Sequence, residues 1–408
     1  MKSIVVSGKN PLHGTVKVGG SKNSALPILF ATLITRGESR INNFPRIGDT
    51  EVALSILTEL GAEIYFDGDA VIINTENLYY REPSEEHVCK IRASTYLIGS
   101  MLSRFGKCRL SAFGGCNFAK RPIDIHLDVC RAMGARKSDN MLFADEIRGA
   151  KVNLRLPSVG ATVNALIMAS VADGVSNIRG YAKEPHILKL IDFLRSAGAK
   201  IDVMDTEILV EGRELHGGNV TIDGDTIEAV TYLAAGVVTD GRVGVWGFDD
   251  TAIDSPLRVM RSLGLSVYLK EGCLFAERGE FSYYAEITAT PYPGFPTDLQ
   301  PIFAPMLSSL SGGKIIDTVW RERFGYLDSL VAFGIKSAHI TDGALIYKSR
   351  LHSGEATSPD LRGGMACLLS ALAASGESII YCAEALLRGY ENLENKLCSL
   401  GASVKIKN

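Results

Sequence analysis

One pattern of apolar and polar positions recurs six times along the 408 residues of the chain. Each copy opens with a glycine and a short β-branched segment that predicts a strand, followed by a loop and a helix-type apolar spacing. The strand-opening glycines are Gly37, Gly106, Gly174, Gly241, Gly313 and Gly376. The glycines expected to close the helices are Gly61, Gly134, Gly198, Gly264, Gly334 and Gly401. This period is longer than that of the common short solenoid repeats, and it indicates a large, internally symmetric α/β protein.

A second, mostly apolar segment precedes each strand-opening glycine and predicts a buried helix. Its first turn is polar in every copy, and these turns contain Ser21, Ser94, Ser158, Thr226, Thr297 and Asp360. Hydroxyl and carboxylate side chains are common helix caps, and capping alone accounts for most of them. A helix N-terminus also favours a bound anion, and Lys22, Arg92 and Arg362 add positive charge beside these turns. The polar first turns can therefore be helix caps only, or they can also form an anion-binding site, and the residues alone leave both interpretations open.

The repeats fall into two sets of three, which predicts two domains. The last repeat ends with a strand at 403–406, and two more strands are expected at 4–6 and 14–18. We therefore predict an N-terminal domain of residues 21–224 and a C-terminal domain formed by residues 1–20 together with 225–408. The chain would cross between them near residues 20 and 224, forming a double hinge beside a ligand cleft.

Composition narrows the class of protein. A hydrophobic content of 46% and a charged content of 22% suit a folded globular chain with sizeable cores. The net charge of -3 argues against nonspecific binding of nucleic acid. The apolar runs are too short to span a bilayer and no signal-peptide pattern opens the sequence, so we expect a cytoplasmic protein. Eight scattered cysteines without CxxC pairs predict reduced thiols and no metal site.

The most specific segment is Phe-Gly-Gly-Cys-Asn-Phe-Ala-Lys-Arg-Pro-Ile-Asp-Ile-His at 113–126. Its two glycines permit an irregular loop, and Cys116 follows them with Lys120 and Arg121 close behind. Nearby cations favour the thiolate, whereas proton donation needs the thiol. A polar, glycine-flanked loop is a poor core environment, so we predict that Cys116 is functional and that most other cysteines are core residues.

Charged residues gather at the junctions between repeats. Arg121, Arg323 and Arg388 follow the second, fifth and sixth predicted strands. A lone arginine in a loop is usually a solvated charge. Equivalent junctions of one domain should, however, face one rim, and several guanidiniums there suit a substrate with phosphate and carboxylate groups. Asp298 opens a predicted helix and is either a cap or a general base for a hydroxyl.

In these residues the chain resembles the UDP-N-acetylglucosamine enolpyruvyl transferases, members of the EPSP synthase-like family. The matching segments run in order along nearly the whole chain: GGSKNSALP at 19–27, RAS at 92–94, GGC and RPID within 114–124, SVGAT at 158–162, FPTDLQ at 295–300, RF at 323–324, DLR at 360–362 and RGY at 388–390. The sister 3-phosphoshikimate enzymes share the Ser-Lys start but lack the cysteine loop. The resemblance implies a two-domain inside-out α/β barrel of six repeated βα units, three per domain, with buried helices at each domain centre.

The resemblance also implies a reaction. The enolpyruvyl group of phosphoenolpyruvate is transferred to the 3′-hydroxyl of UDP-N-acetylglucosamine and phosphate is released, the first committed step of peptidoglycan synthesis and so of cell-wall biogenesis, cell shape and cell division. Cys116 would protonate the methylene carbon and can form a covalent adduct, while Asp298 would accept the proton of the attacking hydroxyl. Lys22, Arg121 and Arg388 would bind phosphoenolpyruvate. No metal and no cofactor is implied, and we expect a monomer or weak homo-oligomer.

The remaining implied contacts concern the sugar nucleotide. Asn23 and Asp298 would hold the sugar. The nucleotide would lie against Arg92 and against two turns, with Val319 contributing from the other domain. The turns consist of Arg121, Pro122, Ile123, Asp124 and Ile125, and of Pro157, Ser158, Val159 and Gly160. Arg323, Asp360 and Arg362 would line the cleft.

Some residues depart from the usual family pattern. They include Leu156 and Pro157 in place of a lysine found in some members, Thr226 and Leu387 in place of an arginine and an aspartate, Arg321 and Glu322, and the glycine pair 363–364. Two alternatives therefore stay open. One is an enolpyruvyl transferase acting on another nucleotide acceptor, such as a nucleoside monophosphate. The other is a non-catalytic sugar-nucleotide-binding protein, against which the intact Lys22, Cys116 and Asp298 argue.

Overall fold

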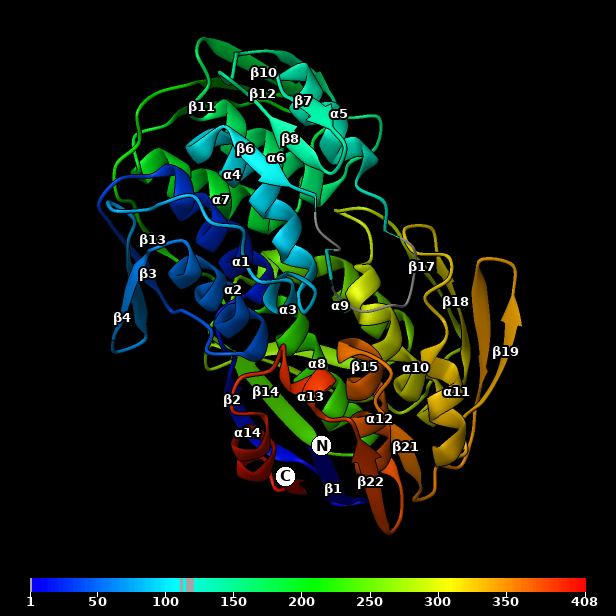
Figure 1. Cartoon of the computed structure of the whole chain (residues 1–408). Helices are drawn as coiled ribbons and strands as arrows, with labels where there is room; N and C mark the ends of the chain where they lie inside the picture. Colours follow the sequence, from blue (N-terminus) through cyan, green and yellow to red (C-terminus); the bar gives the residue numbers. More distant parts are fainter. Residues whose placement is uncertain (1, 111–112, 115–120) are drawn as a thin grey trace. The chain divides into compact units, whose positions relative to one another are not determined.

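The computed structural model describes residues 2–110, 113–114 and 121–408, which fold as an α/β protein (Figure 1). The described chain divides into two compact units. The C-terminal unit contains residues 2–19 and 224–408, and the N-terminal unit contains residues 20–110, 113–114 and 121–223. Each unit has its own hydrophobic core.

Helices α1, α4 and α6 occupy the core of the N-terminal unit. Helix α4 packs against both α1 and α6, while α4 and α6 each pack against a strand of a neighbouring sheet. The helices of this unit are α1 (Lys22–Ala31), α2 (Gly48–Glu59), α3 (Glu85–Val88), α4 (Leu97–Phe105), α5 (Asp124–Ala132), α6 (Val159–Ala169) and α7 (Pro185–Ser196), with 3-10 turns η1 (Thr32–Ile34) and η2 (Arg92–Tyr96).

The strands described in the N-terminal unit form sheets of order β13-β3-β5-β4, β11-β12-β10-β9 and β6-β8-β7. These strands are β3 (Glu38–Asn42), β4 (Glu63–Asp67), β5 (Ala70–Asn74), β6 (Lys107–Arg109), β7 (Arg136–Ser138), β8 (Met141–Phe143), β9 (Lys151–Asn153), β10 (Val175–Arg179), β11 (Lys200–Val203), β12 (Glu207–Glu211) and β13 (Asn219–Thr221).

In the C-terminal unit, helices α8, α10 and α12 pack against one another, and each also packs against a different sheet. The helices of this unit are α8 (Thr226–Val238), α9 (Asp254–Ser262), α10 (Gln300–Ser309), α11 (Tyr326–Leu330), α12 (Leu361–Ala373), α13 (Glu384–Leu387) and α14 (Leu393–Ser399), with 3-10 turns η3 (Asp250–Ile253), η4 (Thr297–Leu299) and η5 (Val331–Phe333).

The sheets of the C-terminal unit have the orders β21-β22-β1-β23, β15-β16-β14-β2 and β17-β18-β20-β19. Their strands are β1 (Ser3–Ser7), β2 (His13–Lys17), β14 (Arg242–Trp246), β15 (Leu265–Lys270), β16 (Cys273–Arg278), β17 (Ala285–Ala289), β18 (Gly313–Asp317), β19 (Lys336–Ile340), β20 (Gly343–Tyr347), β21 (Glu355–Thr357), β22 (Glu377–Tyr381) and β23 (Ser403–Lys407).

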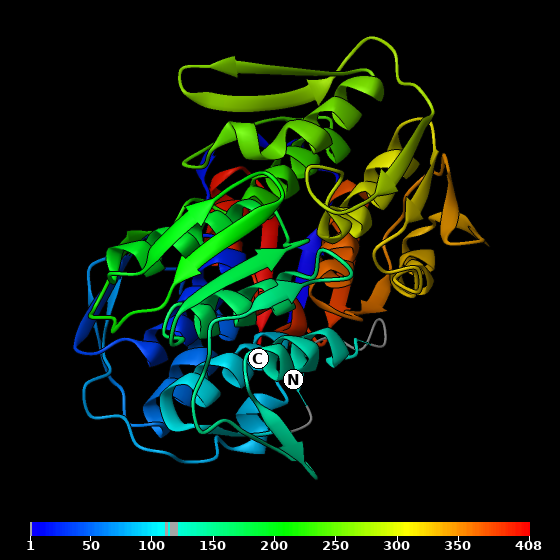
Figure 2. The same cartoon turned by 90° about the horizontal axis from the view of Figure 1, so that it is seen from above.

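The first two strands of the chain belong to sheets of the C-terminal unit. Strand β1 lies antiparallel between β22 and β23, with Ile4 opposite Ile380 and Ile406. Figure 2 shows this blue strand between the orange and red strands of the chain's end. Strand β2 pairs in parallel with β14. The C-terminal core is therefore completed by residues from the opposite end of the sequence.

The central helices are apolar on every side because sheets and other helices surround them. In α12, every residue from Leu361 to Leu372 is buried. The surrounding helices end at glycines as predicted: Gly61 after α2 and Gly401 after α14 have φ of 95° and 96°, which a Cβ would strain. None of the helices in the described part of the chain is long and apolar enough to cross a membrane.

The helix caps follow the prediction only in part. Ser21 and Ser158 accept hydrogen bonds from the N–H groups of Ser24 and Ala161. Helix α8 is capped by Asp225, one residue before the expected Thr226. At the second and fifth central helices the cap prediction is wrong, because 3-10 turns η2 and η4 open them and neither has a side-chain cap.

Candidate active site

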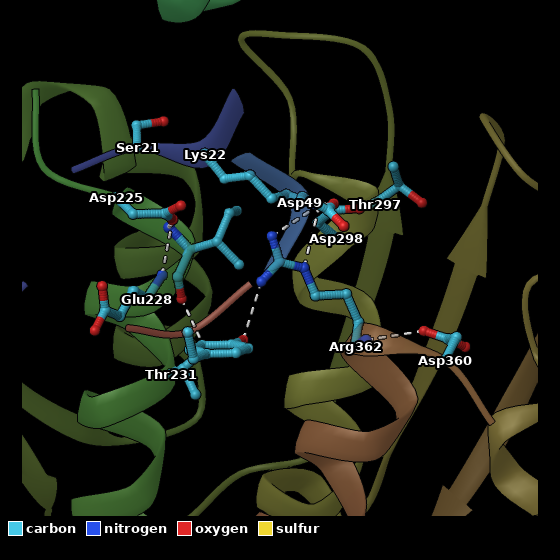
Figure 3. A network of polar contacts seen from close by, with 12 residues as sticks. Ser21, Lys22, Asp49, Asp225, Glu228, Thr231, Thr297, Asp298, Asp360 and Arg362 are labelled. Atoms are coloured by element: carbon cyan, nitrogen blue, oxygen red, sulfur yellow. Dashed lines mark hydrogen bonds and ion pairs between the residues drawn. The ribbon is translucent and has the colours of Figure 1, made fainter. Parts of the chain in front are cut away.

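Asp298 lies in η4, immediately before α10, at the centre of a cluster of charges in the C-terminal unit (Figure 3). The N-cap of α10 is Leu299, so Asp298 does not cap this helix. Its carboxylate instead accepts hydrogen bonds from two arginines. Arg323 Nη1 lies 2.8 Å from Oδ1, and Arg362 Nε and Nη2 lie 3.2 and 3.1 Å from Oδ2. These contacts favour the charged carboxylate, which is the form that a general base requires.

The two arginines are not solvated loop charges. The side chains of Arg323 and Arg362 are only 4% and 2% exposed, whereas that of Asp298 is 29% exposed. Burial by itself lowers the pKa of Arg362, but the interaction with the Tyr390 hydroxyl and the negative charge of Asp298 outweigh burial, and the pKa is raised. Arg362 therefore stays a cation inside the protein, held there by its anionic neighbour.

Arg362 is placed by the start of α12. Asp360 caps this helix by accepting hydrogen bonds from the N–H groups of Arg362 (2.8 Å) and Gly363 (3.1 Å). The glycine pair that departs from the family pattern has a steric reason. A Cβ on Gly363 would lie 2.7 Å from Pro359 Cγ, and one on Gly364 would lie 2.1 Å from Ser358 Oγ. The lower helix propensity of glycine is accepted because nothing larger fits.

Lys22 begins α1 in the N-terminal unit, where Ser21 caps the helix. Its Nζ lies 3.2 Å from Asp49 Oδ2 on α2, and the two side chains are 15% and 7% exposed. Asn23 follows in the same first turn and is half-buried. A cation is thus fixed beside the N–H groups of a helix start, which is a favourable arrangement for an anionic substrate group.

Arg92 and the two turns assigned to the nucleotide lie in the N-terminal unit. Arg92 Nη2 donates to the carbonyl oxygens of Arg121 (2.6 Å) and Pro122 (3.4 Å). Burial, and then the charge of Arg121, lower the pKa of Arg92 to about 10. Asp124 opens α5 and pairs with Arg155, which lies just before the second turn.

His126 connects these turns and was not singled out from the sequence. Its ring packs under Gly160, where a Cβ would lie 2.6 Å from His126 Cε1. His126 Nδ1 lies 2.8 Å from Asn164 Nδ2, and Asn164 Oδ1 accepts the N–H of Gly99. Burial and the charge of Arg92 lower the pKa of His126 to about 4, so the ring is neutral. Its position at the end of the 113–126 segment was the available signal.

For the remaining candidate residues around the cysteine loop, the structure describes only some positions. Cys116 and Lys120 lie outside the described residues. The described Gly114 donates its N–H to Val88 O at 3.2 Å, and a Cβ there would lie 1.6 Å from Cys89 O. Arg388 is half-buried at the C-cap of α13. In the described ranges, no group of three or more His, Cys, Asp or Glu residues could hold a metal ion.

Several further candidates occupy defined backbone positions. Val319 donates its N–H to Asp317 Oδ1 at 2.9 Å. Ile123 is the N-cap of α5 and Ile125 lies in that helix, while Pro157 and Ser158 precede α6, which begins at Val159. The structure thus brings Arg92 and both turns together in one unit, and Asp298, Arg323, Asp360 and Arg362 together in the other.

Comparison with known proteins shows the family to which this chain belongs. Residues 6–397 match the family model of EPSP synthase (3-phosphoshikimate 1-carboxyvinyltransferase), and the chain belongs to this family of carboxyvinyltransferases. The resemblance inferred from the sequence is therefore confirmed.

Within this family, individual proteins and solved structures can be compared with the chain. The UDP-N-acetylglucosamine 1-carboxyvinyltransferases of Halothermothrix orenii and Prosthecochloris aestuarii are each 35% identical to this chain, covering 99% and 100% of it and 99% of their own lengths. Among solved structures, the enolpyruvyl transferase NikO from Streptomyces tendae matches with a TM-score of 0.90 at 26% identity, covering 100% of this chain and 99% of its own. EPSP synthase from Acinetobacter baumannii shares the fold, with a TM-score of 0.71 at 16% identity and full coverage of both chains.

Proposed function

We propose that this chain transfers the enolpyruvyl group of phosphoenolpyruvate to the 3′-hydroxyl of UDP-N-acetylglucosamine and releases phosphate, the first committed step of peptidoglycan precursor synthesis, in the cytoplasm. The observation that carries the proposal is the similarity from end to end to transferases of that name. The presence of Lys22, Cys116, Asp298 and Arg388 at the positions of the family motifs supports it.

We also propose that the six pairs of buried helix and sheet are copies of one βα unit, arranged as a two-domain inside-out α/β barrel that closes about a double hinge near residues 20 and 224. The repetition of the unit is supported by three buried helices and three sheets in the described part of each compact unit. Hinge closure would exclude water from the reacting groups.

In the proposed mechanism, the Cys116 thiol gives a proton to the methylene carbon of phosphoenolpyruvate. The neighbouring carbon becomes cationic, and the 3′-hydroxyl oxygen of the acceptor bonds to it while Asp298 takes the hydroxyl proton. The tetrahedral intermediate then returns a proton from its methyl group to the Cys116 thiolate and expels phosphate, which restores the double bond and the thiol. Lys22, Arg121 and Arg388 would bind the phosphate and carboxylate of phosphoenolpyruvate. The proposal includes no metal and no cofactor.

The acceptor would bind through groups of both units. Asn23 and Asp298 would hold the amino sugar, and the nucleotide would lie against Arg92, the turn 121–125 and the turn 157–160, with Val319 from the C-terminal unit. Because Arg323 and Arg362 both contact Asp298, their proposed contribution is to fix this carboxylate and keep it charged. Asp360 would act by capping the helix that carries Arg362.

One departure favours a second candidate function, transfer to another nucleotide acceptor such as a nucleoside monophosphate. Leu156 is 61% exposed beside the turn 157–160, where some family members have a lysine that contacts the nucleotide. Without this cation, the chain is expected to bind the diphosphate of a sugar nucleotide less tightly.

Phosphate release from phosphoenolpyruvate tests both candidates. We expect release by the intact chain to require UDP-N-acetylglucosamine and to disappear in Cys116→Ala. Release with uridine monophosphate but not with the sugar nucleotide would support the second candidate. If neither acceptor causes release and phosphoenolpyruvate forms no adduct with Cys116, the chain is a binding protein and not this transferase.

A further inference from the structure

Tyr390 and Thr231 extend the Asp298 cluster into the core of the C-terminal unit. Arg362 Nη1 donates to Tyr390 Oη at 3.0 Å, and Tyr390 Oη lies 3.1 Å from Thr231 Oγ1. Thr231 Oγ1 lies 2.7 Å from the carbonyl oxygen of Ile227, in the first turn of α8. Arg362, Tyr390 and Thr231 are each at most 2% exposed. Figure 3 shows Thr231 and Arg362 on facing elements of this cluster.

The chemistry of the donors and acceptors sets the direction of each hydrogen bond in this row from Arg362 through Tyr390 and Thr231 to Ile227. A guanidinium can only donate, so Tyr390 Oη accepts from Arg362. The carbonyl of Ile227 can only accept, so Thr231 gives its own proton there. Tyr390 therefore donates to Thr231, and each hydroxyl both donates and accepts. A buried chain of this kind has one satisfied arrangement, which fixes the orientation of the guanidinium at its end.

We propose that Tyr390, anchored by Thr231, is a positioning residue that fixes the Arg362 guanidinium and thereby holds the Asp298 carboxylate in place for proton transfer. The hydrogen bond to Tyr390 occupies Nη1, which leaves Nε and Nη2 directed at one oxygen of Asp298. The inference rests on the proposed function for its catalytic consequence, but its geometric part concerns the protein alone.

The test compares Tyr390→Phe with a matched control. Tyr326 is also a buried tyrosine of the C-terminal unit, and its hydroxyl has no hydrogen-bond partner among the described residues. Tyr390→Phe should lower kcat about tenfold with the KM for phosphoenolpyruvate almost unchanged, since the base and not the substrate is displaced. Tyr326→Phe should leave kcat unchanged. Equal kcat in wild type and Tyr390→Phe would overturn the proposal.

A pH profile separates positioning from general loss of packing. If Arg362 is held less firmly, its contacts with the charged Asp298 carboxylate become weaker and the pKa of Asp298 rises. The acidic limb of the plot of kcat against pH then moves to higher pH. Arg323 from the loop after β18 and Asp225 from the start of α8 also face this cluster and remain in all variants. Thr231→Val should shift the acidic limb in the same direction. Thr231→Ser keeps the hydroxyl and should therefore retain most of the wild-type dependence of kcat on pH. An unshifted limb in both Tyr390→Phe and Thr231→Val would contradict the proposal.

A measurement without substrate keeps the inference distinct from the proposed reaction. Carbon-13 NMR of labelled aspartate carboxyls, with the Asp298 signal identified by its loss in Asp298→Asn, gives the titration of this group directly. The midpoint should be higher in Tyr390→Phe than in wild type or Tyr326→Phe. If wild type is inactive with UDP-N-acetylglucosamine but this shift is found, the proposed function fails and the positioning role stands. If wild type is active and the midpoints coincide, the positioning role fails.

Discussion

Replacing Asp298 with asparagine removes the negative charge between two buried guanidiniums and should destabilise the C-terminal unit. Asparagine offers one side-chain oxygen, so it can accept from Arg323 or from Arg362 but not from both, and its amide N–H groups face the other cation. At least one charged hydrogen bond is lost, which costs about 1.5–3 kcal/mol, with a further penalty for the cation left inside the protein. Since Asp298 is 29% exposed, water offsets part of that penalty. We expect the free energy of unfolding to fall by about 3 kcal/mol.

The two tryptophans make this measurement specific to the unit. Trp246 and Trp320 are the only tryptophans of the sequence, and both lie in the C-terminal unit. Urea unfolding followed by tryptophan fluorescence therefore reports on the unit that contains Asp298. Asp328→Asn, at an exposed position on α11, is the matched control and should change stability by less than about 0.5 kcal/mol. If Asp298→Asn also changes it by less than about 0.5 kcal/mol, the ion-pair reasoning is refuted.

Three further changes test other parts of the structure. Gly160→Ala places a Cβ 2.6 Å from the His126 ring and should raise the KM for UDP-N-acetylglucosamine several-fold while kcat changes little; Gly325→Ala, which meets no atom within 4 Å, should leave both unchanged. The pKa of His126 is lowered to about 4, against about 6.5 when unfolded, so stability should be lost as pH falls from about 6.5 to 4. Thermal unfolding followed by circular dichroism should show a smaller loss over this range in His126→Gln, and parallel curves would contradict the buried neutral ring. Cys116→Ala should form no adduct with phosphoenolpyruvate in intact-mass measurements, and an adduct in this variant would exclude Cys116 as the attachment site.

The helices were predictable because their signals are local. The apolar segments, each with a polar first turn and a strand-opening glycine after it, indicate α1, α6, α8 and α12. The cap of α8 was missed because Asp225 and Thr226 are both good caps, and only the backbone geometry decides between them. The 3-10 turns at η2 and η4 were missed because no residue pattern in the sequence distinguishes them from a first α-helical turn.

The candidate site was predictable only as residue types and family positions. The sequence motif names Arg362 and Asp298 but does not show that they form an ion pair, because 64 residues separate them. Tyr390 belongs to a recognised motif, yet its role depends on the distant Thr231. His126 closes the recognised segment 113–126, but its contacts with Gly160 and Asn164 arise from tertiary packing and leave no signal in the sequence. Contacts of this kind arise from tertiary packing and need coordinates.

The central claim concerns the product of the reaction. The most direct test incubates the chain with phosphoenolpyruvate and UDP-N-acetylglucosamine and identifies the nucleotide product by mass spectrometry and NMR. The account predicts a carboxyvinyl ether on the 3′-oxygen of the amino sugar, formed together with an equal amount of phosphate. An unchanged sugar nucleotide, or a carboxyvinyl group on a different acceptor only, would contradict it.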